Sequence, residues 1–363
     1  MDDVRRSFVE PEHAERMFER FYRNAKPRAA KRARAERVEE LVAPVPARCG
    51  GFGETEARRD ELDVRAGLSE RRGEVVVVIR RVGRRIRDND THPEYASRVL
   101  IRSWNLFHGR TVPSGRMRYF ERMIRLICEG EPAVVVLQEL AVGTLPRLEA
   151  WSGYTAYGDV AAPARLPDRL ASIVTDVDPN RLRSAVEGQA NAILVKPGLE
   201  VTDHQTIVLN PRGFRKRIAE ELGLHVLLRL RWARERRICQ SVRIRLEDGR
   251  TAVVGNLHAT SLRDDKRVAD AELLRAAAFV DGLANPGEPI VLAGDFNVTV
   301  VTSPTLRALG TSEWGFSQAG PGLDHVLVRG LMPQGPERHW PEDLRRHGNV
   351  LLSDHAPVEL DVQ

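Results

Sequence analysis

The chain has few cysteines and no long apolar run, and each shortage excludes a class of protein. Its three cysteines lie far apart and none forms a Cys-x-x-Cys pair, which argues against a disulfide framework and a zinc site. No apolar stretch reaches the roughly eighteen residues of a membrane-spanning helix. The charged start, Met1 to Arg6, is not followed by the apolar core of a signal peptide. We therefore expect a cytoplasmic protein without integral membrane association.

Aromatic residues are also scarce, at 6% of the chain, and few accompany its basic segments. Proteins that bind single-stranded nucleic acid stack the bases on aromatic side chains, so sequence-specific recognition is not supported. Cys128 lies in a helix pattern and Cys239 in a strand pattern, where each is expected to be a small buried hydrophobe.

Arginine is abundant, and its distribution divides the chain in two. Residues 1–97 form a charged extension whose basic side chains crowd the stretch 16–37; a helix, a solvated arm or a disordered arm would suit this pattern, with nucleic acid or an anionic surface as partner. A Pro- and Gly-rich linker covers 44–53, and Val75 to Ile79 is a lone apolar run. Residues 98–363 are long enough to bury one large catalytic core.

The most informative motif is an apolar strand, Pro289 to Ala293, that stops at Gly294 and then presents Asp295 and Asn297. Strands this rich in Ile, Val and Leu are covered on both faces of a sheet. Ligands of such sheets bind beyond the carboxyl ends of the strands. Asp295 and Asn297 are therefore candidate site residues.

Two segments of about 35 residues repeat one plan, in which a strand, a helix and a second strand follow one another. The expected strands end at polar residues, which in order are Asn105, Glu139, His258 and Asp295. The two units suggest two similar halves that face each other. Their expected strands and helices cover residues 99–104, 119–127 and 133–137 in the first unit, and residues 252–257, 271–283 and the strand from Pro289 that ends at Asp295 in the second.

Other segments complete the expected secondary structure. Residues 238–246 alternate apolar with polar side chains, which predicts a half-exposed strand, and 251–257 returns beside it as a hairpin. A short strand is expected at 192–195. The stretch 159–189, with prolines, charges and few apolar pairs, predicts long loops over the site.

Near the C-terminus the chain carries Gly322-Leu323-Asp324-His325 and, later, Ser353-Asp354-His355. Six motifs now stand in a fixed order: Ser-Trp-Asn, Leu-Gln-Glu, Asn-Leu-His-Ala-Thr, Gly-Asp-Phe-Asn, Leu-Asp-His and Ser-Asp-His. This order resembles that of the endonuclease/exonuclease/phosphatase family, whose members include deoxyribonuclease I, over residues 99–362. The resemblance implies an α/β (α+β) fold: a four-layer sandwich of two mainly antiparallel sheets flanked by helices.

The resemblance also implies hydrolysis of phosphate esters with a divalent metal. Charge gathers on the phosphate oxygens in the transition state, so a hard cation with oxygen ligands suits the reaction. Glu139 is the first candidate ligand for Mg²⁺, with Mn²⁺ as an alternative ion. Asn105 lies beside it as a ligand through water or as an amide that orients the phosphate, and Asp354 completes the metal shell.

The remaining candidates act on the water and the phosphate. Asp295 orients or deprotonates the attacking water, and Asn297 fixes its geometry. His355 stabilises the phosphate oxygens or shuttles a proton, held in its tautomer by Asp324. His258 contacts a non-bridging oxygen. His325, His108, His204 and His225 are expected to be ordinary surface or core histidines, and Ser353 to cap a local turn.

The substrate stays open at this level. A series of arginines between 212 and 237 makes the central loops basic, which would attract any phosphate-rich ligand. A nuclease-like phosphodiesterase is the first reading; inositol phosphates or phospholipid head groups are the alternative substrates. An inactive relative that binds nucleic acid or a protein is the non-enzyme alternative, against which the intact acidic and histidine positions argue. The oligomeric state is not predicted.

Overall fold

The structure is a computed structural model that describes residues 99–163, 188–246, 248–262 and 265–363. The charged extension, the linker at 44–53 and the apolar run at 75–79 lie outside these residues. No described helix combines the length and apolar character needed to cross a bilayer.

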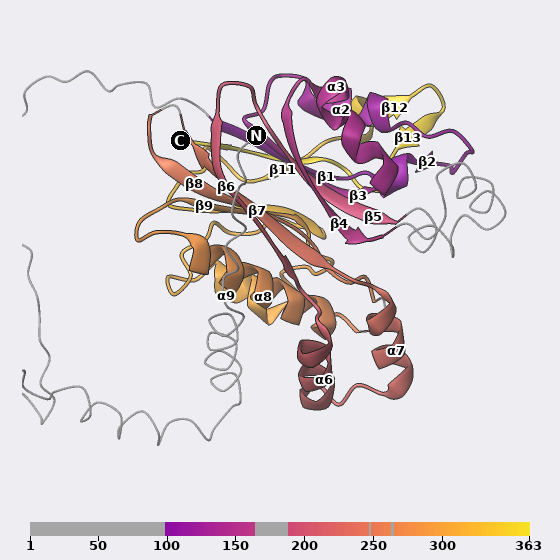
Figure 1. Ribbon diagram of the computed structural model, residues 1–363, viewed down its shortest axis with the longest axis vertical. Coiled ribbons are helices and arrows are strands. Elements are labelled where there is room, and N and C mark those ends of the chain that lie inside the picture. The colour runs from indigo at the N-terminus through magenta and orange to yellow at the C-terminus, as the bar shows by residue number, and fades with distance from the viewer. Residues whose placement is uncertain (1–98, 164–187, 247, 263–264) are drawn as a thin grey trace, which may run out of the picture. The chain divides into compact units, whose positions relative to one another are not determined.

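Two large β-sheets pack face to face with helices on their outer sides, which confirms the four-layer sandwich (Figure 1). The first sheet contains, in spatial order, β11 (Arg338–His339), β14 (Val358–Val362), β1 (Val99–Asn105), β3 (Val134–Leu140), β5 (Gln189–Val195) and β4 (Thr155–Ala162). The second contains β10 (Asp324–Arg329), β9 (Ile290–Asp295), β8 (Thr251–His258), β7 (Ile238–Arg245) and β6 (Glu200–Val208). A small third sheet contains β12 (Arg346–His347), β13 (Val350–Leu352) and β2 (Thr111–Val112).

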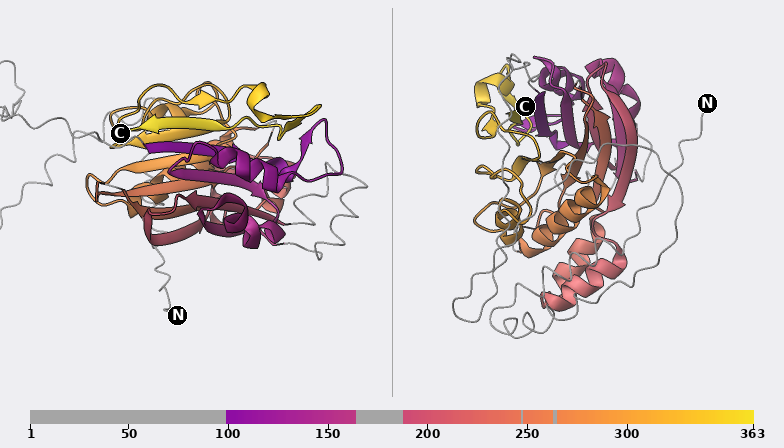
Figure 2. Two further views of the ribbon diagram at one scale, coloured as in Figure 1. Left: turned by 90° about the horizontal axis from the view of Figure 1, so that it is seen from above. Right: turned by 90° about the vertical axis from the view of Figure 1, so that its left-hand side faces the viewer.

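The helices lie outside the sheets, as two views at right angles also show (Figure 2). The α-helices are α2 (Phe120–Cys128), α3 (Leu148–Ser152), α6 (Arg212–Glu221), α7 (Val226–Arg234), α8 (Arg267–Leu283) and α9 (Pro304–Leu309). Short 3-10 helices are η2 (Phe107–Gly109), η3 (Val142–Arg147) and η4 (Glu342–Arg345).

Strand β3 shows how the sequence builds these layers. Successive side chains of a strand point to opposite faces. Val134 and Val136 therefore enter the core between the two sheets, whereas Val135 and Leu137 enter the core beneath α2. All four are buried, so the uninterrupted apolar run is explained by cover on both faces.

The two predicted strand-helix-strand units are confirmed. β1 and β3 are parallel neighbours joined through α2, and β8 and β9 are parallel neighbours joined through α8. All other pairs in the two large sheets are antiparallel. Each parallel unit lies in a different sheet, so the two halves face each other as expected.

Two predictions about local structure were wrong. The stretch expected to be loops from 159 begins inside β4, and its last residue, Gln189, begins β5; residues 164–187 lie outside the described part. Strand β7 is not half-exposed, because Ser241 is buried and Arg243 is partly covered, and only Arg245 at its end is exposed. Arg243, for example, pairs with Glu288 at 2.9 Å. Cross-strand polar contacts of this kind cannot be read from alternation alone.

Candidate active site

Polar side chains meet at one edge of the sandwich, where four strands end and β10 begins. His258 and Asp295, the last residues of the parallel strands β8 and β9, are register partners. Asp324, the first residue of β10, pairs with Asp295 from the other side. Asn105 ends β1 in the facing sheet, and its side-chain amide donates to Asp295 Oδ2 at 3.0 Å. Asp295 therefore contacts residues from both sheets.

The backbone at this edge is held in an unusual conformation. Positive φ angles occur at His108 (52°), Glu139 (54°), Asn297 (54°) and Ser353 (64°). Such angles cost on the order of 1–3 kcal/mol for residues other than glycine, and they concentrate at active sites. Four such residues at one edge indicate a candidate active site, where the backbone is strained in order to orient the side chains.

Gly294 explains why a glycine precedes the aspartate. Its φ is 139°, and a Cβ on this residue would lie 1.9 Å from the carbonyl oxygen of Leu257 in the neighbouring strand. Only glycine permits this approach. The close contact brings the ends of β8 and β9 together, and with them His258 and Asp295.

Asp295 is buried, with an exposure of 2%. One oxygen accepts from Asn105 and lies 3.4 Å from His258 Nε2. The other accepts the backbone N–H of Asn297 at 3.0 Å. Burial raises the pKa of Asp295, and the charge of the neighbouring Asp324 raises it further. A carboxylate with a raised pKa accepts a proton more readily, as a general base must.

Asp324 and His355 form a pair. His355 Nδ1 lies 2.7 Å from Asp324 Oδ2, and Asp324 Oδ1 is buried without a hydrogen bond among the described residues. Burial alone would lower the pKa of His355, but the charges of Asp324, Asp295 and Asp354 raise it to about 10. The imidazole is therefore protonated at neutral pH, with Nδ1 on Asp324 and Nε2 left to meet a substrate.

His258 is held in the opposite protonation state. Its Nδ1 lies 3.1 Å from Arg237 Nη1 and 2.9 Å from Gln189 Nε2. A guanidinium can only donate, so Nδ1 accepts and the ring proton is on Nε2. Burial, followed by the charge of Arg237, lowers the pKa of His258 well below its ordinary value. His258 is thus a neutral donor whose N–H is directed toward Asp295 and Glu139.

Glu139 faces the cluster from β3. Its carboxylate lies 3.7 Å from His258 Nε2 and 3.7 Å from His108 Nε2, and about a fifth of its side chain is exposed. Burial raises the pKa of Glu139, while the charges of Arg237 and His355 lower it. The exposed Asp354 raises the pKa of both Glu139 and His355, which places its charge beside them. Two carboxylates thus border the open side of the cluster.

The donor set fits a hard divalent cation. One atom each from Asp295, Asp324 and His355 lies within 4.8 Å of the others, and because the His355 ring is charged, the ligands come from the carboxylates of this group and from Glu139 and Asp354. Carboxylates without thiolate suit Mg²⁺ or Mn²⁺. Asp324 Oδ1, which is buried without a hydrogen bond among the described residues, is available to a cation or to a hydrogen-bond donor.

Asn105 and Ser353 orient their neighbours. The Asn105 amide oxygen accepts the backbone N–H of Phe107 at 3.0 Å, so this amide faces Asp295 with its donor rather than a metal with its oxygen. Ser353 Oγ donates to the Asn105 carbonyl at 2.7 Å and accepts the His355 N–H at 3.1 Å. Ser353 therefore caps the local turn as predicted.

The structure brings the predicted residues Asn105, Glu139, His258, Asp295, Asn297, Asp324 and His355 into one cluster, with Asp354 at its exposed border. Among the described residues, the side chains of Gln189 and Arg237 also contact it, as does His108, which was expected to be an ordinary histidine. Arg237 belongs to a basic run that is typical of a solvated surface, yet its exposure is only 7%. Its position directly before a strand that pairs with the His258 strand is the one signal that could have identified it.

His325 is an ordinary buried histidine, as predicted. Its Nδ1 lies 2.9 Å from Glu337, and its ring packs on Phe296. His204 pairs with Asp159 on the strands β6 and β4, away from the cluster. His225 is exposed before α7.

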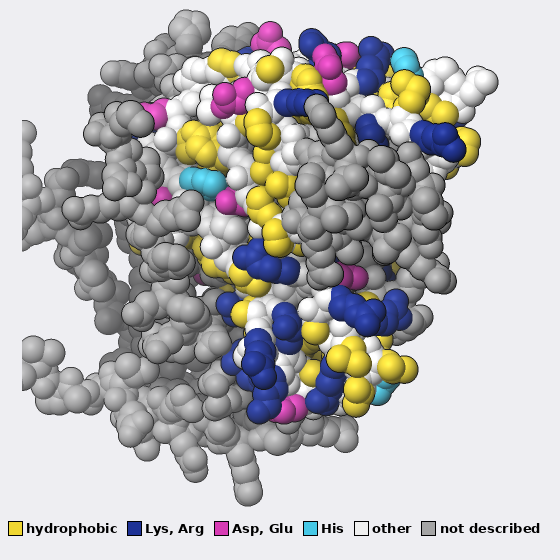
Figure 3. All heavy atoms as spheres, turned by 45° about the vertical axis from the view of Figure 1, so that its right-hand side comes forward, with side chains coloured by type: hydrophobic (Ala, Val, Ile, Leu, Met, Phe, Trp, Pro, Cys, Tyr) yellow, Lys and Arg dark blue, Asp and Glu magenta, His cyan; other side chains and the backbone are white. Residues whose placement is uncertain are grey.

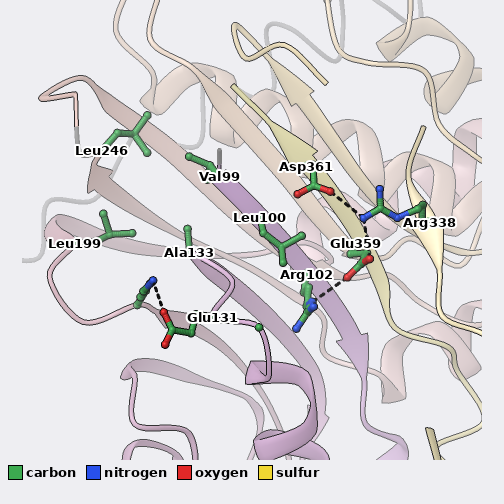
Figure 4. A pocket seen from close by; sticks show the side chains of 12 residues that line it. Val99, Leu100, Arg102, Glu131, Ala133, Leu199, Leu246, Arg338, Glu359 and Asp361 are labelled. Carbon is green, nitrogen blue, oxygen red and sulfur yellow. Dashed lines mark hydrogen bonds and ion pairs between the residues drawn. The ribbon is translucent and has the colours of Figure 1, made fainter. Parts of the chain in front are cut away.

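A separate pocket of about 480 Å³ lies at the other end of β1 (Figure 4). Its charged side chains point toward one another: Arg102 pairs with Glu359 at 3.0 Å, and Arg338 pairs with Glu359 at 2.9 Å and with Asp361 at 2.8 Å. Each charge here has a partner of opposite sign, and none of the motif residues lines the pocket.

The sequence model of the Endonuclease/Exonuclease/phosphatase family matches residues 103–355, which include every residue of the cluster. The chain belongs to this family. The match confirms the resemblance seen in the motifs, and enzymes of the family generally hydrolyse phosphate ester bonds. Curated relatives are two UPF0294 proteins of Vibrio cholerae, each 32% identical over 139 residues, or 35% of this chain and 45% of theirs. The match thus spans about half of those relatives.

Solved structures confirm the fold of the family. An endonuclease/exonuclease/phosphatase from Bacteroides vulgatus superposes with a TM-score of 0.52 at 16% identity, covering 74% of this chain and 99% of that one. The catalytic domain of human Nocturnin, solved with a bound sulfate anion, superposes with a TM-score of 0.52 at 15% identity, covering 73% and 93%. At these identities the likeness concerns the sandwich alone.

Proposed function

We propose that the chain is a metal-dependent phosphodiesterase in which the cluster around Asp295 is the active site. The observation that supports this most is the pair of opposite histidines that flank one buried carboxylate. His258 is a neutral donor, and His355 is a charged one. A phosphodiester carries negative charge on its non-bridging oxygens and gains more on the leaving oxygen, so both donors have a partner.

The residues divide the reaction among them. Asp295 accepts a proton from the attacking water while the backbone N–H of Asn297 and the amide of Asn105 hold the carboxylate in place. The new bond joins the water oxygen to phosphorus, and the bond from phosphorus to the leaving oxygen breaks. His258 donates to a non-bridging oxygen, and His355 gives its Nε2 proton to the leaving oxygen while Asp324 retains the ring.

Glu139 and Asp354 would hold the divalent cation at the open side of the cluster. The cation, when bound, neutralises charge on the phosphate and lowers the cost of its approach to four acidic residues. The unpartnered oxygen of Asp324 gives this group a further potential contact. Without the cation, the convergence of Glu139, Asp295, Asp324 and Asp354 repels an anionic substrate.

A hydrolysis screen tests the proposal. Purified full-length protein is incubated with bis(p-nitrophenyl) phosphate, single-stranded and duplex DNA, RNA, inositol phosphates and sphingomyelin, each with Mg²⁺, Mn²⁺ or EDTA. We expect turnover of at least one phosphodiester with either cation and none in EDTA. Undiminished turnover after exhaustive chelation would contradict the metal requirement. The nuclease-like reading stays a prediction that the nucleic acid arms of the same screen decide.

A further inference from the structure

The hairpin formed by α6 and α7 joins β6 to β7 and stands away from the sheets (Figure 1). Its base lies at the active-site edge, because β7 begins beside the end of β8. Asn210 closes this base: its side chain donates to the Glu235 carbonyl at 2.6 Å and accepts the Arg237 N–H at 3.0 Å. Arg237 is the residue that holds His258, so the hairpin and the site share one support.

Helix α7 is apolar on two sides. Leu228 and Trp232 face inward and are buried, and Trp232 Nε1 donates to Glu272 at 2.7 Å. On the outward side, Val226 and Leu227 are each 68% exposed and Leu230 is 54% exposed. Three large aliphatic side chains on one outward face of a nine-residue helix exceed what packing of the hairpin requires.

The hairpin is also strongly basic. Residues 211–237 contain nine basic and three acidic side chains, a formal charge of +6, whereas the whole chain carries +5. The hairpin is therefore a concentration of positive charge within the described residues, and the stretch 16–37 is another in the sequence. In the space-filling view, Lys and Arg side chains gather around the exposed apolar side chains of this lower part of the molecule (Figure 3).

We propose that the α6–α7 hairpin docks on the surface of an anionic phospholipid bilayer. Aliphatic side chains surrounded by Lys and Arg match such a surface, because the side chains enter the boundary between head groups and acyl chains while the cations meet the lipid phosphates. Nucleic acid fits less well, since its bases stack on aromatic rings, and the hairpin's two aromatic residues, Phe214 and Trp232, are buried.

Docking would hold the active-site edge within about 14 Å of the bilayer, the length of a nine-residue helix, because Val226 and Leu227 begin α7 and Arg237 follows its end. For what is cleaved there, the inference rests on the proposed function and favours phosphodiesters of lipid head groups. The binding itself does not depend on catalysis. The two can therefore be tested apart, with binding measured in EDTA and catalysis measured on a soluble phosphodiester.

A fluorescent probe at the hairpin tests the docking. Leu227→Cys is introduced into the full-length chain with Cys49→Ser, since Cys128 and Cys239 are buried, and is labelled with an environment-sensitive fluorophore. Met332→Cys is the matched control, because Met332 is 67% exposed and lies at the opposite edge of the sandwich. Vesicles contain either phosphatidylcholine alone or equal parts phosphatidylcholine and phosphatidylglycerol.

We expect the probe at 227 to brighten severalfold and shift to the blue with the anionic vesicles only, and the probe at 332 to stay unchanged. In sedimentation of unlabelled protein with these vesicles, Leu227→Gln with Leu230→Gln should lower binding at least about tenfold, and Met332→Gln should not. A silent probe at 227, or equal responses at both positions, would overturn the proposal. A silent probe at 227 together with DNA binding that weakens in Lys216→Gln with Arg234→Gln would indicate nucleic acid as the partner of the hairpin instead.

Discussion

The two ends of β1 carry charged side chains in different arrangements. At the pocket end, Arg102, Arg338, Glu359 and Asp361 alternate in sign and pair at about hydrogen-bond distance. At the active-site end, Glu139, Asp295, Asp324 and Asp354 converge with the same sign, balanced by Arg237 and one charged histidine. In the first arrangement each charge is neutralised by a neighbouring side chain. In the second the negative charge exceeds the positive, which favours binding of a cation.

The pKa values follow this difference. Burial alone would raise the pKa of Glu359, but hydrogen bonds from Trp340 and Arg338 and the charge of Arg102 lower it. The pKa of Asp295 is raised by burial and by Asp324. Perturbed carboxylates that lack a cationic partner are typical of catalytic and metal-binding sites. The pocket of about 480 Å³ lies at the end where the charges are paired, and none of the cluster residues lines it.

The largest effect is expected from Asp295→Asn, which removes the proton acceptor and keeps the shape. Turnover should fall at least about a hundredfold, and His355→Ala should have an effect of similar size. Both variants should keep the far-ultraviolet circular dichroism of the wild-type protein. The measurement is kcat on the phosphodiester found in the screen. Near-normal kcat in both variants would refute the site assignment.

The next effect concerns Arg237→Gln, which removes the charge that adds to burial in keeping His258 neutral. The pKa of His258 should rise toward its ordinary value, because burial would still lower it but the repulsion from the Arg237 charge would be gone. Turnover should fall about tenfold or more, and the acid limb of the pH–rate profile should move to higher pH. An NMR titration of the ring measures the pKa directly. Arg234→Gln, an exposed neighbour, is the control.

At the pocket end, Glu359→Gln should change stability and leave chemistry alone. Arg102 would lose its carboxylate partner but keep its bonds to the carbonyls of Ile127 and Glu129. We expect a loss of about 2 kcal/mol in the free energy of unfolding, measured with urea, and kcat within about twofold of wild type. A large fall in kcat would break the distinction between the two ends.

The smallest effect is a dependence of stability on pH. The pKa of His355 is about 10 in the folded protein and near 6.5 when unfolded, so its pair with Asp324 contributes fully below pH 6.5 and is lost as pH rises through 10. The wild-type protein should exceed His355→Gln in free energy of unfolding at pH 6 by about 1–2 kcal/mol more than at pH 10.5. An advantage that is equal at both pH values would contradict the shifted pKa.

The sequence predicts the layers of this fold because strand and helix signals are local. The segment from Pro289 to Asn297 predicts a strand and its end without reference to any other segment. The helix-like spacing of apolar residues over 271–283 predicts most of α8. The predicted cluster residues all lie where such strands stop. Their order along the chain identifies the family that the sequence match confirms.

What could not be predicted depends on partners distant in sequence. Gln189 and Arg237 gain their importance only through His258, which is 69 and 21 residues away. Asp159 was expected in a loop, but its carboxylate accepts from Thr206 of β6 at 2.6 Å and lies 2.6 Å from His204 Nε2. The exposure of Leu227 and Leu230 also could not be read from the sequence, since apolar helices are normally buried.

The contact between the two ends of the domain has a consequence for synthesis of the enzyme. Ser353 bonds to Asn105 across 248 positions, Trp104 donates to the His355 carbonyl, and β14 pairs with β1. During synthesis, β1 therefore pairs with β14 only after the residues between them have been made. Folding must close this long loop, which is slow. Under the proposed function, a chain that ends before Ser353 lacks His355 and is expected to be inactive.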